Sequence, residues 1–221
     1  MLARLTPIRN WIFDLDNTLY PHGVRLFEQV DRRITAYIGR MFQVERDEAY
    51  RIQKNYFHTR GTTLAGLMAE HGVDPHDYLA DVHDIEMDML EENAPLAAAI
   101  AKLPGRKLIF TNADALYAGK ILARLGLHES FEAIHDVHAL NYKPKPEPWA
   151  YRHICETYGL DPHECLFADD MARNLKPAKD IGMTTLWVDN GSEQAEELRV
   201  EHVDFTTRDI THWLHDILED S

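Results

Sequence analysis

Four short apolar runs, set far apart along the 221-residue chain, constrain the fold more than any other feature of the sequence. They are Trp11–Phe13, Leu108–Phe110, Cys165–Ala168 and Thr185–Val188. Each run has the length and composition of a buried parallel strand, and amphipathic helical patterns separate one run from the next. A last strand is expected near Val203–Phe205. This alternation predicts an α/β fold with a parallel sheet.

Two glycines mark where helices between these strands should end. A helix is expected over Ala113–Leu125, where Gly126 stops it, and another over Glu147–Tyr158, where Gly159 has the same role. A last helix, close to Asp209–Leu218, would close the domain. These helices complete the expected core.

The segment between the first two strands has a different pattern, because it has helical spacing and almost no strand-like run. One apolar stripe is formed by Val24, Phe27, Val30, Ile34, Tyr37, Ile38 and Met41. Further helical patterns lie near Glu45–His58, Thr62–His71 and Pro75–Leu90. We therefore expect a helical cap of residues 21–92, inserted after the first strand into a core domain of residues 1–20 and 93–221.

Composition excludes several classes of protein. The net charge of −14 argues against a nucleic-acid polymer as partner, since proteins that coat nucleic acids present clustered positive charge. Two cysteines suggest neither a disulfide framework nor a cysteine zinc site. No run approaches eighteen apolar residues and the first ten residues lack a secretory signal, so we expect a soluble, cytoplasmic protein without membrane contact.

Two carboxylates close the first strand. Asp14 and Asp16 stand two positions apart, and alternate residues of a strand point to the same side of the sheet. Carboxylates this close are costly to ionise together unless a cation lies between them or one of them stays protonated and acts as an acid. The pair alone could also cap a turn, as aspartates often do.

Polar residues follow two more strands in the same way. Thr111 and Asn112 come after the second strand, and Asp169 and Asp170 come after the third. Ligands of such sheets bind at the carboxyl ends of the strands, so these groups should converge on one crevice. A proline-rich loop, Lys143–Pro148, adds two ammonium groups just before a helix.

These residues resemble the four motifs of the haloacid dehalogenase superfamily, over roughly residues 9–191. Asp14-x-Asp16-x-Thr18 is similar to the first motif, Thr111 to the second, a Lys-Pro lysine to the third and Asp169-Asp170 to the fourth. The resemblance implies a Rossmann-like core with a helical cap. It also implies that the lysine is Lys145 rather than Lys143, because the lysine of this family generally stands six residues before an aromatic, here Tyr151.

The resemblance assigns roles to the carboxylates. Asp14 would attack phosphorus to form an aspartyl-phosphate, and Asp16 would protonate the leaving oxygen and then activate water. Asp14, the backbone carbonyl of Asp16, and Asp169 would hold Mg²⁺, with Asp170 as a second-shell or water-mediated partner.

The remaining core groups would bind the phosphate. Thr111 and Asn112 would contact the phosphoryl oxygens, and Lys145 would neutralise the charge that grows on them and on Asp14. An acid at position 16 favours phosphate monoester hydrolysis over dehalogenation, since a dehalogenase has no alkoxide to protonate. A β-phosphoglucomutase-like phosphotransferase would use the same core groups.

Substrate choice should lie in the cap. Phe13–Pro21 and Gly61–Leu67 are similar to the pyrimidine 5′-nucleotidase branch, which implies a small phosphorylated metabolite such as UMP or CMP. The candidates to contact sugar or base are Tyr20, His22, Tyr56, Arg60 and Thr62. Tyr56 could instead pack between cap helices. Phosphoglycolate and sugar phosphates remain alternative substrates, and a non-catalytic, phosphate-binding regulatory protein is the alternative from another class.

Overall fold

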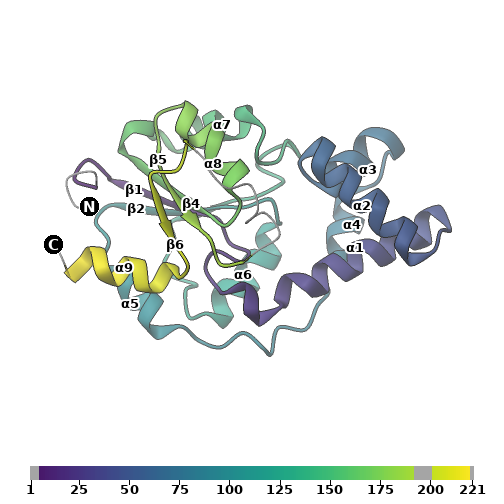
Figure 1. Cartoon of the computed structure of the whole chain (residues 1–221), viewed down its shortest axis with the longest axis horizontal. Helices are drawn as coiled ribbons and strands as arrows, with labels where there is room; N and C mark the ends of the chain where they lie inside the picture. Colours follow the sequence, from purple (N-terminus) through teal and green to yellow (C-terminus); the bar gives the residue numbers. More distant parts are fainter. Residues whose placement is uncertain (1–4, 192–200, 220–221) are drawn as a thin grey trace.

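A six-stranded parallel sheet forms the centre of the protein in a computed structural model, which describes residues 5–191 and 201–219 (Figure 1). The strands lie in the order β3-β2-β1-β4-β5-β6, and every neighbouring pair is parallel. Their bounds are β1 Asn10–Phe13, β2 Arg106–Phe110, β3 Ala133–His135, β4 Cys165–Asp169, β5 Thr184–Val188 and β6 Phe205–Thr207. The α/β fold expected from the sequence is confirmed.

β1 lies between β2 and β4, and its register brings the strand ends into line. Phe13, the last residue of β1, pairs with Ile109 on one side and Ala168 on the other. All three strands run in the same direction, so the residues that follow them emerge at one edge of the sheet. Every residue of β1 is buried, as a central strand of a parallel sheet requires.

Helices cover both faces of the sheet, and each face has its own hydrophobic core. Their bounds are α5 Ala94–Lys102, α6 Ala115–Arg124, α7 Pro148–Tyr158, α8 Ala172–Asp180 and α9 Ile210–Glu219. α5, α6 and α9 contribute Ile100, Tyr117 and Trp213 to one core. α7 and α8 contribute Ile154 and Leu175 to the other.

Four helices form an insertion between β1 and α5, which projects from one end of the sheet in Figure 1. They are α1 Leu26–Phe42, α2 Arg46–Arg60, α3 Thr63–His71 and α4 Pro75–Val82, preceded by a short 3₁₀ helix at His22–Val24. This helical insertion has its own apolar cluster, which includes Ile38, Leu67 and Leu79. The boundaries expected at residues 20/21 and 92/93 stay a prediction.

The helix expected over Pro75–Leu90 is shorter in the structure, because it ends at Val82. The apolar residues beyond it, Met87 and Leu90, pack into the sheet core instead of continuing the helix. They belong to the segment that connects the insertion back to the core. Their spacing matches that of a helix, although this segment is not helical.

Three other elements differ from the expectation. The sequence analysis did not identify β3, a three-residue strand, or α5. The last strand lies at Phe205–Thr207 and overlaps the expected run Val203–Phe205 only at its end. Within residues 5–191 and 201–219, no helix combines the length and the apolar character that crossing a bilayer would need.

Candidate active site

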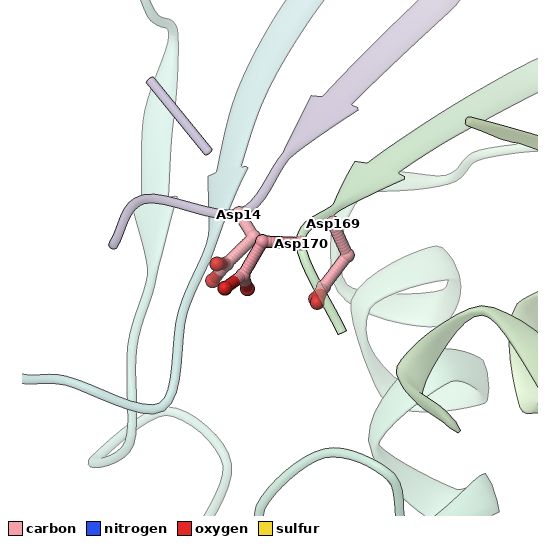
Figure 2. A group of neighbouring side chains, drawn as sticks. All are labelled: Asp14, Asp169 and Asp170. Carbon is pink, nitrogen blue, oxygen red and sulfur yellow. The ribbon is translucent and has the colours of Figure 1, made fainter. Parts of the chain in front are cut away.

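Three carboxylates meet at the carboxyl ends of β1 and β4. Asp14 directly follows β1, Asp169 is the last residue of β4, and Asp170 is the next. One carboxylate oxygen from each can be chosen so that all three lie within 4.8 Å of one another. In Figure 2 the three carboxylates extend from the ends of β1 and β4 toward the same side.

The Lys145 ammonium lies between two of these carboxylates. It donates to Asp14 Oδ1 at 2.8 Å and to Asp169 Oδ2 at 2.7 Å, and the residue is 1% exposed. Lys143 is exposed and lies over the ring of Trp149, with its ammonium 5.0 Å from the ring centroid. The geometry therefore brings Lys145, and not Lys143, to the carboxylates.

Asn112 holds the backbone of this lysine. Its side-chain amide donates to the carbonyl of Lys145 at 3.1 Å and accepts from the amide of Lys145 at 2.8 Å. These two hydrogen bonds, one to the backbone carbonyl and one to the backbone amide of the same residue, fix the loop that carries Lys145. Asn112, which the sequence predicted as a phosphate ligand, therefore also positions Lys145.

Asp169 is enclosed by donors. Besides Lys145, it accepts from the Asn174 amide at 3.0 and 3.1 Å and from the Met171 backbone at 2.8 Å. Its 0% exposure and these contacts fix the orientation of the carboxylate. Asn174, on the first turn of α8, was not identified by the sequence analysis.

The carboxylates outnumber the ammonium group, and this imbalance affects Asp14. Burial raises the pKa of Asp14 to about 7; Lys145 opposes this shift and the Asp169 charge adds to it. Burial lowers the pKa of Lys145, but the Asp14 and Asp169 charges outweigh burial and the pKa is raised. Buried negative charge without full compensation, presented as oxygen ligands, fits a hard divalent cation such as Mg²⁺.

Asp16 is held by two tyrosines. Its Oδ1 atom accepts from the Tyr20 hydroxyl at 2.5 Å and from the Tyr117 hydroxyl at 2.9 Å. Burial raises the pKa of Asp16, and these two hydrogen bonds oppose that shift. Tyr20, a candidate for substrate contact in the sequence, is 2% exposed and bonded to Asp16.

Two hydroxyls complete this edge of the sheet. Thr111, just after β2, is 1% exposed and its Oγ1 accepts from the Ala113 amide at 3.0 Å. Thr18 donates to Asp14 Oδ2 at 3.3 Å. Both contacts limit the rotation of groups next to the carboxylates.

A cavity of about 600 Å³ opens above these groups, between the sheet edge and the helical insertion. Asp14, Asp16, Thr111, Asn112, Lys145 and Asp170 form part of its wall. His22 and Thr62, two of the cap candidates, also line it.

Tyr56 and Arg60 are absent from the cavity wall. Tyr56 packs on Gly66 and bonds Glu70, and Arg60 pairs with Glu70 on the surface. α2 turns these two side chains toward α3 because the cavity-facing positions of α2 are occupied by residues such as Gln53 and Phe57. We therefore do not assign them a contact with substrate.

Comparison with known sequences agrees with this geometry. The model of the family "haloacid dehalogenase-like hydrolase" matches residues 8–182. N-acetylmuramic acid 6-phosphate phosphatase of Pseudomonas putida is 34% identical over 116 residues, which are 51% of this chain and 50% of that protein. Bifunctional epoxide hydrolase 2 of Mus musculus is 44% identical over 54 residues, 24% of this chain and 10% of that protein. The chain thus spans half or less of these relatives.

Solved structures share the fold over almost the whole chain. A HAD phosphatase from Thermococcus onnurineus aligns with a TM-score of 0.62 and 18% identity, covering 96% of this chain and 98% of that one. L-2-haloacid dehalogenase from Xanthobacter autotrophicus aligns with a TM-score of 0.62 and 21% identity, covering 97% and 100%. With the family model matching most of its length, the chain belongs to the haloacid dehalogenase-like hydrolases.

Proposed function

We propose that this protein is a magnesium-dependent phosphate monoester hydrolase that acts through an aspartyl-phosphate on Asp14. The observation that carries the proposal is the Lys145 ammonium between Asp14 and Asp169, with Asp16 on the wall of the same cavity. A nucleophilic carboxylate, a cation and a second acid are the groups that phosphoryl transfer through a covalent intermediate needs.

In the first step, the Asp14 carboxylate attacks phosphorus and the bond from phosphorus to the leaving oxygen breaks. Asp16, protonated, gives its proton to that oxygen, so the product leaves as a neutral alcohol. In the second step, the Asp16 carboxylate takes a proton from water, which attacks the aspartyl-phosphate. Phosphate is released, Asp14 is regenerated and Asp16 is protonated again.

The other groups act on charge and position. Lys145 stabilises the negative charge of the phosphoryl oxygens, and Asn112 keeps Lys145 in place. Mg²⁺ bound by Asp14, Asp169 and Asp170 would supply further positive charge to the transferring group. The presence of an acid at Asp16 favours this reaction over dehalogenation, which has no alkoxide to protonate.

For the substrate, we infer a pyrimidine nucleoside 5′-monophosphate. The cavity of about 600 Å³ leaves room for a leaving group of nucleoside size above the reactive carboxylates. Its wall includes the aromatic residues Phe57 and Tyr78. These groups support a nucleotide base.

A sugar phosphate is the second candidate. The likeness to N-acetylmuramic acid 6-phosphate phosphatase, which is named for a phosphorylated sugar, supports it. Polar groups on the cavity wall, such as Thr62 and Asn17, are also suited to sugar hydroxyls.

A panel of phosphate monoesters tests both levels of the proposal. UMP, CMP, purine monophosphates, phosphoglycolate and hexose phosphates are incubated with Mg²⁺ or with EDTA, and released phosphate is measured. We expect magnesium-dependent release, highest for UMP or CMP. A preference for hexose phosphates would replace the nucleotide with the sugar phosphate, and no release from any ester would leave a non-catalytic phosphate-binding protein.

The nucleophile is tested separately. Asp14→Asn should abolish turnover and leave the thermal unfolding transition in place, whereas the wild type should form an acyl-phosphate that hydroxylamine cleaves. Turnover by the variant would remove Asp14 from this role.

A further inference from the structure

A cluster outside the four family motifs contacts Asp16. Tyr117, on α6, is 2% exposed and donates its hydroxyl to Asp16 Oδ1, from 101 residues further along the chain. Tyr20 donates to the same oxygen. Within the described residues, no hydrogen bond reaches Oδ2 of Asp16, and Asp16 lines the cavity. One oxygen is therefore held by two donors, and the other, in a residue that lines the cavity, is left without a hydrogen bond from the described part of the chain.

Tyr117 is in turn held by a residue from the helical insertion. The ring of His83, the first residue after α4, stacks on Tyr117 with centroids 4.1 Å apart and planes at 17°. The imidazole Nδ1 of His83 bonds Asp114 Oδ2 at 2.5 Å. The side chains of this pair are only 12% and 10% exposed, so the contact is shielded from water.

Asp114 contacts both His83 and Tyr117. Its Oδ1 atom caps α6 by accepting from the Tyr117 amide at 2.9 Å, while its Oδ2 atom bonds His83. The Asp114 carboxylate thus fixes the backbone of Tyr117 directly, and it fixes the ring of Tyr117 through His83. His83 returns the chain from the insertion to the core, so the cluster links the position of the insertion to the position of the Tyr117 hydroxyl.

We propose that Tyr117 is a positioning residue for Asp16, and that His83, at the end of the helical insertion, and Asp114, at the start of α6, hold Tyr117 in place. This inference rests on the proposed function. Two donors on Oδ1 fix the plane of the carboxyl group, so Oδ2 is the atom that exchanges a proton with the leaving oxygen. A misplaced proton donor lowers the rate of phosphoryl transfer only when the leaving group must be protonated as it departs.

This dependence on the leaving group separates positioning from a general structural role. An alkoxide leaving group is strongly basic and requires protonation, whereas p-nitrophenolate is weakly basic and leaves without it. The parameter to compare is kcat/KM, because it reports the steps up to phosphoryl transfer to Asp14 and not the later hydrolysis.

The experiment compares wild type, Tyr117→Phe and His83→Ala on an alkyl phosphate and on p-nitrophenyl phosphate. We expect Tyr117→Phe to lower kcat/KM for the alkyl ester by about tenfold, a part of what general acid catalysis supplies, and to change the value for the aryl ester by less than about twofold. His83→Ala should act in the same direction. Tyr158→Phe, which removes a hydroxyl on α7, is the matched control and should change neither value.

A second comparison makes the result independent of folding. In an Asp16→Asn background, Tyr117→Phe should leave the residual kcat/KM on p-nitrophenyl phosphate and on the alkyl ester unchanged, because the group it positions is gone. Equal slowing of both esters, or slowing that persists in that background, would overturn the inference alone. If the wild type hydrolyses neither ester, the proposed function fails and the inference fails with it.

Discussion

Lys145 and Asp14 form an ion pair of 2.8 Å, although 131 residues separate them in the sequence. The same ammonium reaches Asp169 at 2.7 Å, so one cation joins the loop before α7 to the ends of β1 and β4. Removing it would leave two buried carboxylates facing each other.

Lys145→Met should therefore be both inactive and unstable. Breaking a buried ion pair by removing one partner costs about 3–5 kcal/mol, and here two carboxylates lose their cation. Urea unfolding measures the loss, and Mg²⁺ should restore part of it if, as proposed, it binds the same carboxylates. Lys143→Met is the matched control, and we expect it to stay within about 0.5 kcal/mol of wild type because Lys143 is exposed. Equal losses in the two variants would contradict the assignment.

The two aspartates after β4 should differ in their effect on Mg²⁺. The family resemblance assigns the direct metal contact to Asp169. In the structure Lys145, Asn174 and Met171 donate to the Asp169 carboxylate, and Asp170 lines the cavity together with Asp14. We expect Asp170→Asn to weaken Mg²⁺ binding by roughly tenfold or more and Asp169→Asn to weaken it less. Titration calorimetry measures the Mg²⁺ affinity of both variants. A larger loss of affinity in Asp169→Asn would favour Asp169 as the direct metal ligand.

In mild acid, His135 should contribute a loss of stability, whereas Asp14, whose pKa burial raises, should contribute in the opposite direction. The His135 side chain is 0% exposed, and neither ring nitrogen has a hydrogen-bond partner among residues 5–191 and 201–219. Burial, with a smaller contribution from the nearby His153, lowers its pKa to about 4, and Asp136 opposes the shift. In the unfolded chain, His135 binds a proton near pH 6.5. The contribution of neutral His135 to the free energy of unfolding is therefore fully present above that pH and is lost as pH falls toward 4, by up to about 3 kcal/mol.

His135→Leu tests this expectation. The free energy of unfolding is measured with urea at pH 7.5 and pH 5, and the value at pH 5 relative to pH 7.5 should be higher in the variant than in wild type, because Asp14 is common to both proteins. His128→Gln changes a histidine whose side chain is 65% exposed, and it should keep the wild-type difference between the two pH values. An unchanged difference in His135→Leu would exclude the expected contribution of this histidine.

Arg173 should help to hold the helical insertion against the core. Its guanidinium lies 4.0 Å from the Phe57 ring centroid and donates to the Phe57 carbonyl at 3.4 Å and to the Gly61 carbonyl at 3.3 Å. Lysine cannot reproduce a stacked, forked contact, so we expect Arg173→Lys to speed hydrogen exchange around residues 57–62 by about tenfold. Lys176→Arg, an exposed change on the same helix, should leave that exchange unchanged, and equal rates in both variants would contradict the role of Arg173.

The strands and the residues that follow them could be predicted because their signals are local. Trp11–Phe13 and Cys165–Ala168 are apolar runs that end in aspartates, and parallel strands place such ends at one edge. The family spacing from Lys145 to Tyr151 favoured Lys145 over Lys143. The helical insertion was visible for the same reason, since residues 21–92 have helical spacing.

Other features depend on contacts that no local pattern encodes. β3 is a three-residue edge strand with little apolar character of its own. Met87 and Leu90 have helical spacing but pack against the sheet, which only the path of the returning chain explains. Tyr117 and His83 meet Asp16 because α6 and the end of α4 lie together, so their part in the site had no sequence signal.

The position of β1 in the middle of the sheet has a consequence for biosynthesis. This strand is synthesised before both of its partners, Arg106–Phe110 and Cys165–Asp169, which follow much later in the chain. The helices α1–α4 contact one another locally, so they can form before the partner strands are synthesised. During that time both edges of β1 are unpaired, and unpaired strand edges are prone to pair wrongly. A nascent chain therefore carries Asp14 without its ion-pair partners, and the centre is assembled only after translation has passed Asp169.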